Sequence, residues 1–420
     1  MYQSTQLSNG VRIATAHMPH MASVSVGVWV GIGSRYEPAH LNGACHFIEH
    51  MLFKGTRKRS AKDISQAVEG VGGYLNAFTG EESTCFHARA GHKHFAEVLD
   101  VLMDMLLNSQ FAPRELTKER AVIKEEIAMY LDEPQHHVQE LLNATLWPGQ
   151  SLGRPITGTT RTLDSLHRAH LLAYVQQNYV ANSVVIVAAG QVNHRQVVRA
   201  AQPYLKRFPV GPRPDCPPAR NGQSTPRVRL FSKKIEQTQV ALGLRTCSRH
   251  DERRFALRLL NTILGENMSS RLFQVLREDR GLVYSVYTTP SFFDDTGDLV
   301  ISAGLDTGHL PQVLRLVGRE LRRLRDEPPG PTELRRARDY VMGQIDLGQE
   351  STDNQMNWVG EQMLGYGRIY TAAETKRRLL QVTPAHIRSV AREFLRPDRA
   401  NLALVSPVKA EEKLLGHLGL

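Results

Sequence analysis

The chain has 420 residues, of which 41% are hydrophobic and 22% are charged. This composition is typical of a globular protein and excludes the collagen-like, disordered and coiled-coil classes, and the length predicts two domains rather than one core. Lys and Arg outnumber Asp and Glu by 52 to 42, which gives a net charge of +10. The excess lies on helical faces such as residues 319–325, without interleaved aromatic residues, so we expect no nucleic-acid partner.

Three features of the sequence indicate where in the cell the protein is found. The longest apolar runs, such as residues 183–189, are far shorter than the roughly 20 residues that cross a bilayer, so we expect no membrane association. The start of the chain matches neither a secretory signal nor an Arg-rich transit peptide, which predicts a cytoplasmic protein. The alternative is the mitochondrial matrix, after removal of a presequence. Scattered spacing predicts free thiols for the four cysteines, Cys45, Cys85, Cys216 and Cys247.

The hydrophobic pattern predicts strands and helices in a mixed order. A turn signal at residues 7–11 indicates a hairpin, and alternation over residues 23–31 indicates a strand. A β-branched run at residues 183–187 predicts the strand that closes the first half. Between these strands, helical periodicity predicts helices over residues 61–71, 94–107, 115–131 and 163–178.

The second half of the sequence repeats the first. Three short matches carry the repeat, and they pair Ser34 with Ser248, Pro113 with Pro331, and His170 with His386. The separation is nearly the same in each pair, which predicts a duplicated α+β domain, each copy a mostly antiparallel sheet covered by helices. Proline and polar residues mark the linker. The predicted limits are residues 1–210, a linker at 211–228, and residues 229–420.

The residues His46, Glu49 and His50 form an H-x-x-E-H pattern. On a helix these positions share one face, so both imidazoles can reach one cation while the carboxylate stands beside it. Phe47, Ile48, Met51 and Leu52 provide an apolar flank that would bury such a helix. The pattern therefore predicts a metal site with a base, although a polar helix face is the alternative.

A catalytic zinc ion takes three protein ligands and leaves one position to water, so a third ligand is needed. The acidic helix predicted over residues 115–131 has Glu119 and Glu126 two helical turns apart, on the same side. Glu126 could bind the metal, and Glu119 could orient a ligand histidine from behind. The alternative is a solvated charged face, because Lys118, Lys124 and Glu125 are close by in the sequence.

These motifs resemble those of the pitrilysin/insulinase family of inverzincin metallopeptidases, in its group of short chains that includes the mitochondrial processing peptidase and bacterial relatives. In that family the ligand glutamate follows the last histidine of H-x-x-E-H at a characteristic separation, and His50 and Glu126 have the same separation. The resemblance implies one Zn²⁺ per chain, held by His46, His50 and Glu126. It further implies Glu49 as the general base and Glu119 as a supporting carboxylate, and it leaves Glu125 unmatched.

Two further segments resemble the same family. Residues 72–79 are similar to its edge strand beside the zinc, which implies that Gly73, Asn76, Ala77 and Phe78 bind substrate. A core strand is the alternative. Residues 269–284 are similar to its second-half signature, which implies that Arg277 and Tyr284 bind substrate and polarise the scissile carbonyl. Arg280 and Tyr287 have the same spacing and remain an alternative pair.

The resemblance spans nearly the whole chain and carries expectations about function and assembly. It implies a zinc-dependent endopeptidase that hydrolyses short or unfolded peptides, presequences included, inside a closed dimeric chamber. We expect a homodimer, with a heterodimer with a related subunit as the alternative. The repeat sets Leu260, Ile263 and Leu264 opposite the H-x-x-E-H residues and Gln344 opposite Glu126, so we expect no metal in the second half. A non-catalytic structural or regulatory subunit is the competing function.

Overall fold

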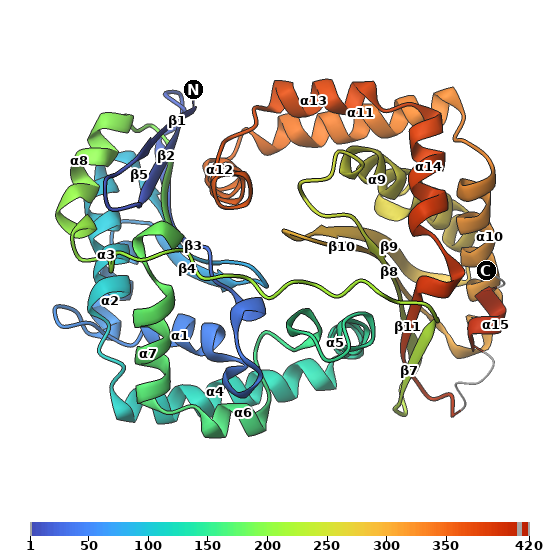
Figure 1. The fold of residues 1–420 in the computed structure, drawn as a ribbon, viewed down its shortest axis with the longest axis horizontal. Coiled ribbons are helices and arrows are strands. Elements are labelled where there is room, and N and C mark those ends of the chain that lie inside the picture. Colours follow the sequence, from blue (N-terminus) through green and yellow to red (C-terminus); the bar gives the residue numbers. More distant parts are fainter. Residues whose placement is uncertain (1, 410–413, 419–420) are drawn as a thin grey trace. The chain divides into compact units, whose positions relative to one another are not determined.

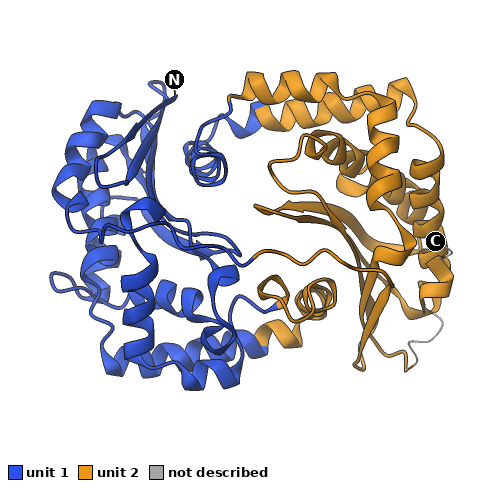
Figure 2. Cartoon of the chain, viewed as in Figure 1, with its two compact units in different colours: residues 1–128, 154–217, 346–370 blue, residues 129–153, 218–345, 371–420 orange. Residues whose placement is uncertain are grey.

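The computed structural model describes residues 2–409 and 414–418, which form two compact units (Figures 1 and 2). Neither unit is one continuous stretch of chain. Unit 1 consists of residues 1–128, 154–217 and 346–370, and unit 2 of residues 129–153, 218–345 and 371–420. Each half of the sequence therefore gives one segment to the unit that the other half mainly builds.

Unit 1 contains a six-stranded sheet with the order β1-β2-β6-β3-β5-β4. All neighbouring strands are antiparallel except β2 and β6, which are parallel. The predicted hairpin is the β1–β2 pair, and the predicted strands at 23–31 and 183–187 are β3 and β6. The strands are β1 (Tyr2–Gln6), β2 (Arg12–His17), β3 (Ser23–Val30), β4 (Tyr74–Thr79), β5 (Thr84–Gly91) and β6 (Val184–Gly190).

Unit 2 contains a five-stranded sheet with the order β7-β11-β8-β10-β9. Taken along the sheet, these strands occupy the places of β2, β6, β3, β5 and β4, and again the first pair alone is parallel. The predicted duplication of a mostly antiparallel α+β domain is therefore confirmed. The strands are β7 (Arg227–Ser232), β8 (Gln237–Thr246), β9 (Val283–Phe292), β10 (Gly297–Asp306) and β11 (Ala400–Ser406).

Helices cover both faces of the unit 1 sheet, and the pleat of the strands separates the two cores. Along β6, Val184 and Ile186 pack into the larger core with α1, α3 and α8, whereas Val185 and Val187 pack on the other face against α12. A strand that is buried on both faces reads as a continuous apolar run. The helices are α1 (Ala44–Leu52), α2 (Ala61–Glu69), α3 (Phe95–Asn108), α4 (Pro113–Asp132), α6 (Thr160–Ser165), α7 (Arg168–Asn178), α8 (His194–Leu205) and α12 (Thr352–Tyr366).

Unit 2 is built in the same way. Along β11, Leu402 and Leu404 face the larger core, and Ala403 and Val405 pack against α5 on the opposite face. The helices are α5 (Pro134–Leu146), α9 (Arg254–Asn261), α10 (Leu310–Asp326), α11 (Pro331–Gly348), α13 (Ala372–Gln381), α14 (Pro384–Phe394) and α15 (Leu414–Leu418), with π-helical segments at Thr262–Glu266 and Phe273–Glu278.

The segments that the halves exchange are the helices α5 and α12, and each lies on the sheet of the other half's unit. Both sheets have a glycine under the incoming helix. A Cβ atom at Gly27 of β3 would overlap Met356 of α12, and one at Gly243 of β8 would overlap Leu146 of α5. Gly27 and Gly243 occupy equivalent positions in the two copies of the repeat. The site that receives the exchanged helix is therefore the same in both sheets. The predicted limits of the two halves and their linker describe the repeat along the sequence. The compact units are defined by packing and therefore have other limits.

One expected helix is wrong in part. The segment 163–178 forms two helices, α6 and α7, because the backbone is extended at Leu166 and His167. The backbone N–H of His167 then donates to His170 Nδ1 at 3.3 Å at the start of α7. The apolar period continues across this break, so periodicity alone does not reveal it. The other expected helices match α2, α3 and α4 within a few residues.

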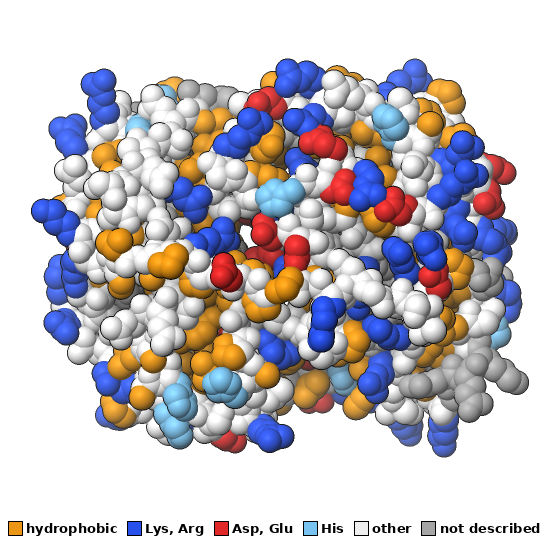
Figure 3. Space-filling view, viewed as in Figure 1, with side chains coloured by type: hydrophobic (Ala, Val, Ile, Leu, Met, Phe, Trp, Pro, Cys, Tyr) orange, Lys and Arg blue, Asp and Glu red, His pale blue; other side chains and the backbone are white. Residues whose placement is uncertain are grey.

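Basic side chains are spread among acidic ones on the face drawn in Figure 3. In the segment 319–325, basic residues also pair with an acid below the surface. Arg319 and Arg323 both contact the carboxylate of Glu320, which is fully buried, so part of the basic excess neutralises an acid within α10. Within the described part of the chain, no helix is both long enough and apolar enough to span a bilayer.

The packing of α12 on the unit 1 sheet generates a stability prediction. A methyl group at Gly360 would overlap the buried Trp29 ring, so we expect Gly360→Ala to lower the free energy of unfolding by about 1–3 kcal/mol. Urea unfolding measures the change. Gly343 in α11 has no atom near its missing Cβ, and Gly343→Ala should leave stability unchanged or raise it by up to about 1 kcal/mol. Equal effects of the two variants would contradict this packing.

Candidate metal centre

The helix α1 (Ala44–Leu52) carries the H-x-x-E-H residues and is held by burial of its other side. Phe47, Ile48, Met51 and Leu52 are at most 1% exposed, as the predicted apolar flank requires. Cys45 is also fully buried, its Sγ lies 3.4 Å from Tyr174 Oη, and burial raises its thiol pKa well above the usual value. The buried side makes α1 a rigid platform, and Cys45 takes no part in the polar face.

His46, His50 and Glu126 come together although α1 and α4 are far apart in the sequence. Glu126 Oε2 lies 3.7 Å from His46 Nε2 and 3.7 Å from His50 Nε2. Two zinc–ligand bonds of about 2.1 Å at a tetrahedral angle place their donor atoms about 3.4 Å apart, so the donors are spaced for one zinc ion. Among the described residues, this is the one group of three metal-binding side chains that converges in this way.

Glu119 lies behind the candidate ligands, two helical turns before Glu126 on α4. Its Oε2 is 3.1 Å from His50 Nδ1, and its Oε1 is 2.9 Å from Lys54 Nζ. A carboxylate at this position accepts a hydrogen bond from the protonated Nδ1. The unprotonated Nε2 then faces Glu126. Sequence reasoning placed Glu119 in this supporting position but missed Lys54, which no helical spacing links to α4.

His46 is in the protonation state that a metal ligand needs. Burial and, to a smaller extent, the neighbouring His50 lower its pKa to about 4, and Glu126 opposes both effects. The imidazole is therefore neutral at pH 7, with Nε2 toward Glu126. Its Nδ1 atom is buried and has no hydrogen-bond partner among the residues that the structure describes.

Glu49 lies beside the three candidate ligands and is positioned by strand β4 (Tyr74–Thr79). Burial raises the pKa of its carboxyl, and a 2.5 Å hydrogen bond donated by Thr79 Oγ1 to Glu49 Oε2 opposes this effect. A carboxylate in a partly buried site is a stronger base than one in water. The role of Thr79 was missed because a contact between a helix and a strand leaves no spacing signal in the sequence.

The predicted substrate strand is β4, which lies at an edge of the unit 1 sheet. Asn76 and Phe78 are exposed, whereas Ala77 packs against the larger core. Gly73 precedes the strand, where a Cβ atom would crowd Val68 and Arg89 O. An edge strand leaves one row of backbone groups without a strand partner, which is the feature that strand addition requires. The binding role of these four residues stays a prediction.

The predicted second-half pair lies in unit 2. Arg277 is in the π-helical segment and its Cζ is 5.1 Å from the centre of the Phe273 ring and 5.9 Å from that of the Tyr284 ring. Tyr284 is 70% exposed on the edge strand β9. In the alternative pair, Arg280 Nη1 contacts Val275 O instead. The structure thus brings Arg277 and Tyr284 together, and their role in catalysis stays a prediction.

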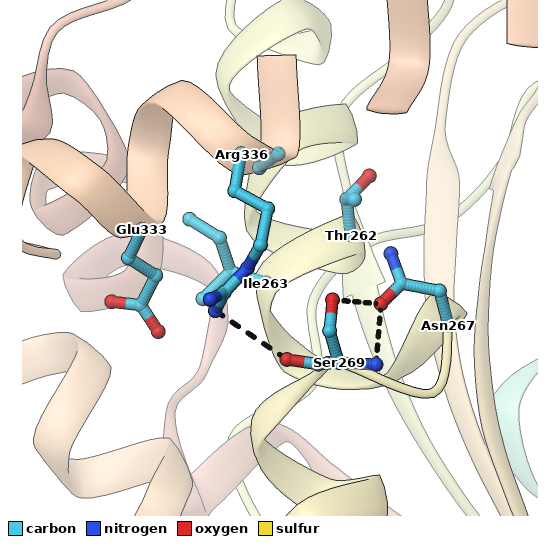
Figure 4. A pocket seen from close by; sticks show the side chains of 7 residues that line it. Thr262, Ile263, Asn267, Ser269, Glu333 and Arg336 are labelled. Carbon is cyan, nitrogen blue, oxygen red and sulfur yellow. Dashed lines mark hydrogen bonds between the residues drawn. The ribbon is translucent and has the colours of Figure 1, made fainter. Parts of the chain in front are cut away.

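Figure 4 shows the place in unit 2 that corresponds to the metal centre under the repeat. Ile263, opposite Glu49, and Ala337, opposite Glu119, line a cavity of about 10 Å³ that has room for roughly one water molecule. Arg336 Nη2 donates to Ser269 O at 3.5 Å, and Ser269 Oγ donates to Asn267 Oδ1 at 2.8 Å. These hydrogen bonds connect the lining residues, and among the residues that the structure describes no three metal-binding side chains converge here.

Comparison with known families identifies the chain. The profile of insulinase (peptidase family M16) matches residues 12–160, and that of the peptidase M16 inactive domain matches residues 165–341. A Streptomyces coelicolor protein described as an uncharacterized zinc protease is 38% identical over 414 residues, 97% of this chain and 90% of that protein. A Bacillus subtilis protein with the same description is 37% identical and covers 95% of this chain and 97% of its own length. The chain belongs to the insulinase family of peptidases, family M16.

Solved structures share this fold at low sequence identity. A protease from Helicobacter pylori superimposes with a TM-score of 0.90 at 18% identity, covering 97% of this chain and 99% of the other. A peptidase M16 inactive domain from Pseudomonas fluorescens gives a TM-score of 0.89 at 18% identity, covering 98% and 99%. The two-unit architecture is therefore that of short members of the family.

The geometry generates a prediction about metal binding. Glu126 faces both imidazoles, whereas the adjacent Glu125 is not among the converging donors, so we expect Glu126→Gln to lower zinc affinity and Glu125→Gln to leave it unchanged. Loss of a supporting group alone costs about 10–100-fold in affinity, so loss of a ligand should cost more than about 100-fold. Competition with a chromophoric chelator measures both values. Equal affinities in the two variants would remove Glu126 from the ligand set.

Proposed function

We propose that this protein is a zinc-dependent endopeptidase that hydrolyses short or unfolded peptides. One observation carries the proposal: two imidazoles and one carboxylate converge on one point, with a fourth group, Glu49, held beside them by Thr79. The family and the names of its relatives support a peptidase of this kind. A merely structural centre would close the site with a fourth ligand rather than with a base.

The residues of this chain divide the chemistry among them. A zinc ion held by His46, His50 and Glu126 would supply Lewis acidity toward the peptide carbonyl and make a water molecule more acidic. Glu49 takes the proton of the attacking water and transfers it to the leaving amine. Glu119 holds the tautomer of His50, and Thr79 fixes the rotamer of Glu49. Arg277 and Tyr284 would donate to the oxyanion that develops.

Edge-strand binding suits a peptidase with broad specificity. An extended peptide alongside β4 would form main-chain hydrogen bonds, which do not depend on its sequence, and the exposed Phe78 would contact alternate side chains. Short or unfolded peptides can extend alongside this edge readily, whereas most backbone groups of a folded protein are already paired. The proposed substrate class is therefore short or unfolded peptides, including presequences.

We further propose that the chain works as a homodimer, in which Arg277 and Tyr284 of one subunit serve the metal centre of the other. The presence of both the metal centre and the pair in one chain supports this arrangement over a heterodimer with a related subunit. A non-catalytic subunit is the alternative function. The intact set of ligands and base argues against it, because nothing in a scaffold role maintains Glu49 beside the imidazoles.

Removal of the base tests the proposed chemistry. Glu49→Gln keeps the size of the side chain and can still accept from Thr79, but it cannot take a proton, so we expect the rate of peptide cleavage to fall by about 10²–10⁴-fold. Zinc content should stay at about one ion per chain in both proteins, since Glu49 is not among the converging donors. The assay is a quenched fluorescent peptide library with metal analysis. Zinc without cleavage in the unmodified chain would favour a heterodimer whose partner subunit is missing from the assay, and neither zinc nor cleavage would favour the non-catalytic subunit.

Mixed dimers test the role of Tyr284 and the assembly together. We expect Tyr284→Phe to lower kcat by about 10²–10³-fold through loss of a donor to the oxyanion, and Tyr287→Phe to have little effect. If the pair acts in the other subunit, mixing Glu49→Gln with Tyr284→Phe chains creates one complete site per mixed dimer, so activity returns after subunit exchange. Continued inactivity of verified mixed dimers would show that both groups act within one chain.

A further inference from the structure

The amino end of α1 lacks the side-chain cap that helices commonly have. The residue at the N-cap position is Gly43, with φ of +94°, and it offers no side-chain oxygen to the first turn. A larger residue does not fit, because a Cβ atom there would lie 2.8 Å from Thr157 O and 2.9 Å from Gly158 Cα. The free amide groups of the first turn must therefore find an acceptor elsewhere.

Glu37 is that acceptor. Its Oε1 accepts from the backbone N–H of Cys45 at 2.7 Å, and its Oε2 accepts from the N–H of Gly43 at 2.8 Å and from Asn42 Nδ2 at 3.0 Å. The residue is 1% exposed, and burial raises the pKa of its carboxyl while the three donated hydrogen bonds oppose this effect. All three contacts are donors to the carboxyl oxygens, a pattern that favours the ionised carboxylate against the effect of burial. The dipole at the amino end of α1 favours the same form.

A second layer holds this contact in place. Arg154 donates to the backbone oxygen of Glu37, and Asn42 Nδ2 also donates to Pro155 O at 3.0 Å. Gly158, with φ of +77°, packs so closely that a Cβ atom would lie 2.6 Å from Asn42 O. The Glu37 carboxylate and residues 155–158 thus both pack against the first turn of α1 and the residues just before it.

These contacts lie directly before the candidate ligands in the sequence. Cys45, whose amide Glu37 binds, precedes His46 by one residue, so these hydrogen bonds act together with the apolar packing of α1 to fix the rotation of the helix at that point. Ligand atoms lie about 5–6 Å from a helix axis, so a rotation of only about 20° would displace an imidazole nitrogen by about 2 Å. Metal–ligand distances tolerate only about 0.2 Å.

We propose that Glu37 is a positioning residue for the metal centre: its buried carboxylate sets the rotation of α1 so that His46 and His50 converge on Glu126. The proposal rests on the zinc site of the proposed function. It assigns Glu37 no contact with substrate or metal. It differs from a general contribution to folding in that it predicts an effect on the metal centre beyond any loss of stability.

The test compares zinc affinity and the absorption spectrum of the Co²⁺-substituted protein in the full chain. Glu37→Gln places an amide NH₂ group where only donors surround it, so we expect zinc affinity to fall by about 10–100-fold and the cobalt bands to change in position or intensity. Glu37→Asp, which keeps the charge but shortens the reach, should give a smaller loss. If Glu37→Gln does not fold, the affinity and spectrum of Glu37→Asp decide the question.

Two controls separate positioning from stability. Gly360→Ala weakens unit 1 through the packing of α12 rather than at α1, and Glu320→Gln removes another fully buried carboxylate, from α10. Both should keep the zinc affinity and the cobalt spectrum of the unmodified chain. Glu37 variants with unchanged affinity and spectrum, or controls with the same losses, would overturn the proposal alone. An unmodified chain that binds no zinc would overturn the proposed function as well.

Discussion

The candidate metal centre depends on the placement of two carboxylates in the apolar stripe of α4. The buried residues of this helix are Leu116, Glu119 and Ile123, at spacings of three and four positions, and Glu126 continues the same stripe three positions later. An amphipathic helix presents this stripe to its neighbours, so the packing that buries Leu116 and Ile123 also directs both carboxylates toward α1. The candidate ligand Glu126 and its neighbour Glu119 are therefore positioned by the same apolar packing that folds the domain.

Carboxylates in a core stripe destabilise a fold unless other groups compensate their charge. Lys54 and His50 surround Glu119, and the two imidazoles face Glu126. The duplicated domain shows the other solution. In α11 the corresponding stripe is Leu334, Ala337 and Val341, which match the three buried residues of α4 in order and at the same spacings. Unit 2 thus keeps the helix and its packing while an apolar residue, Ala337, stands in place of the acid, so no buried charge has to be compensated at that position.

Local periodicity explains which parts of this structure could be predicted from the sequence. The H-x-x-E-H face and the two-turn spacing of the acids on α4 are helical repeats, and the duplication appears as a constant offset, so all of them are visible along the chain. Lys54, Thr79 and Glu37 each make contacts across elements, and a single hydrogen bond leaves no period. The exchange of α5 and α12 was hidden for a related reason: an apolar helix face does not encode which of two similar sheets it covers.

The contact between Thr79 and Glu49 couples substrate binding to the chemistry in the proposed mechanism. Thr79 is the last residue of β4, and its backbone pairs with Thr84 of β5 while its hydroxyl binds the base. A peptide that adds to β4 takes its register from the strand, in steps of two residues because alternate residues face the same side. In the proposed mechanism, the strand end that holds Glu49 through Thr79 would also set the register of a bound peptide. Small shifts of the edge strand would move the bound peptide and the base together, which preserves their alignment.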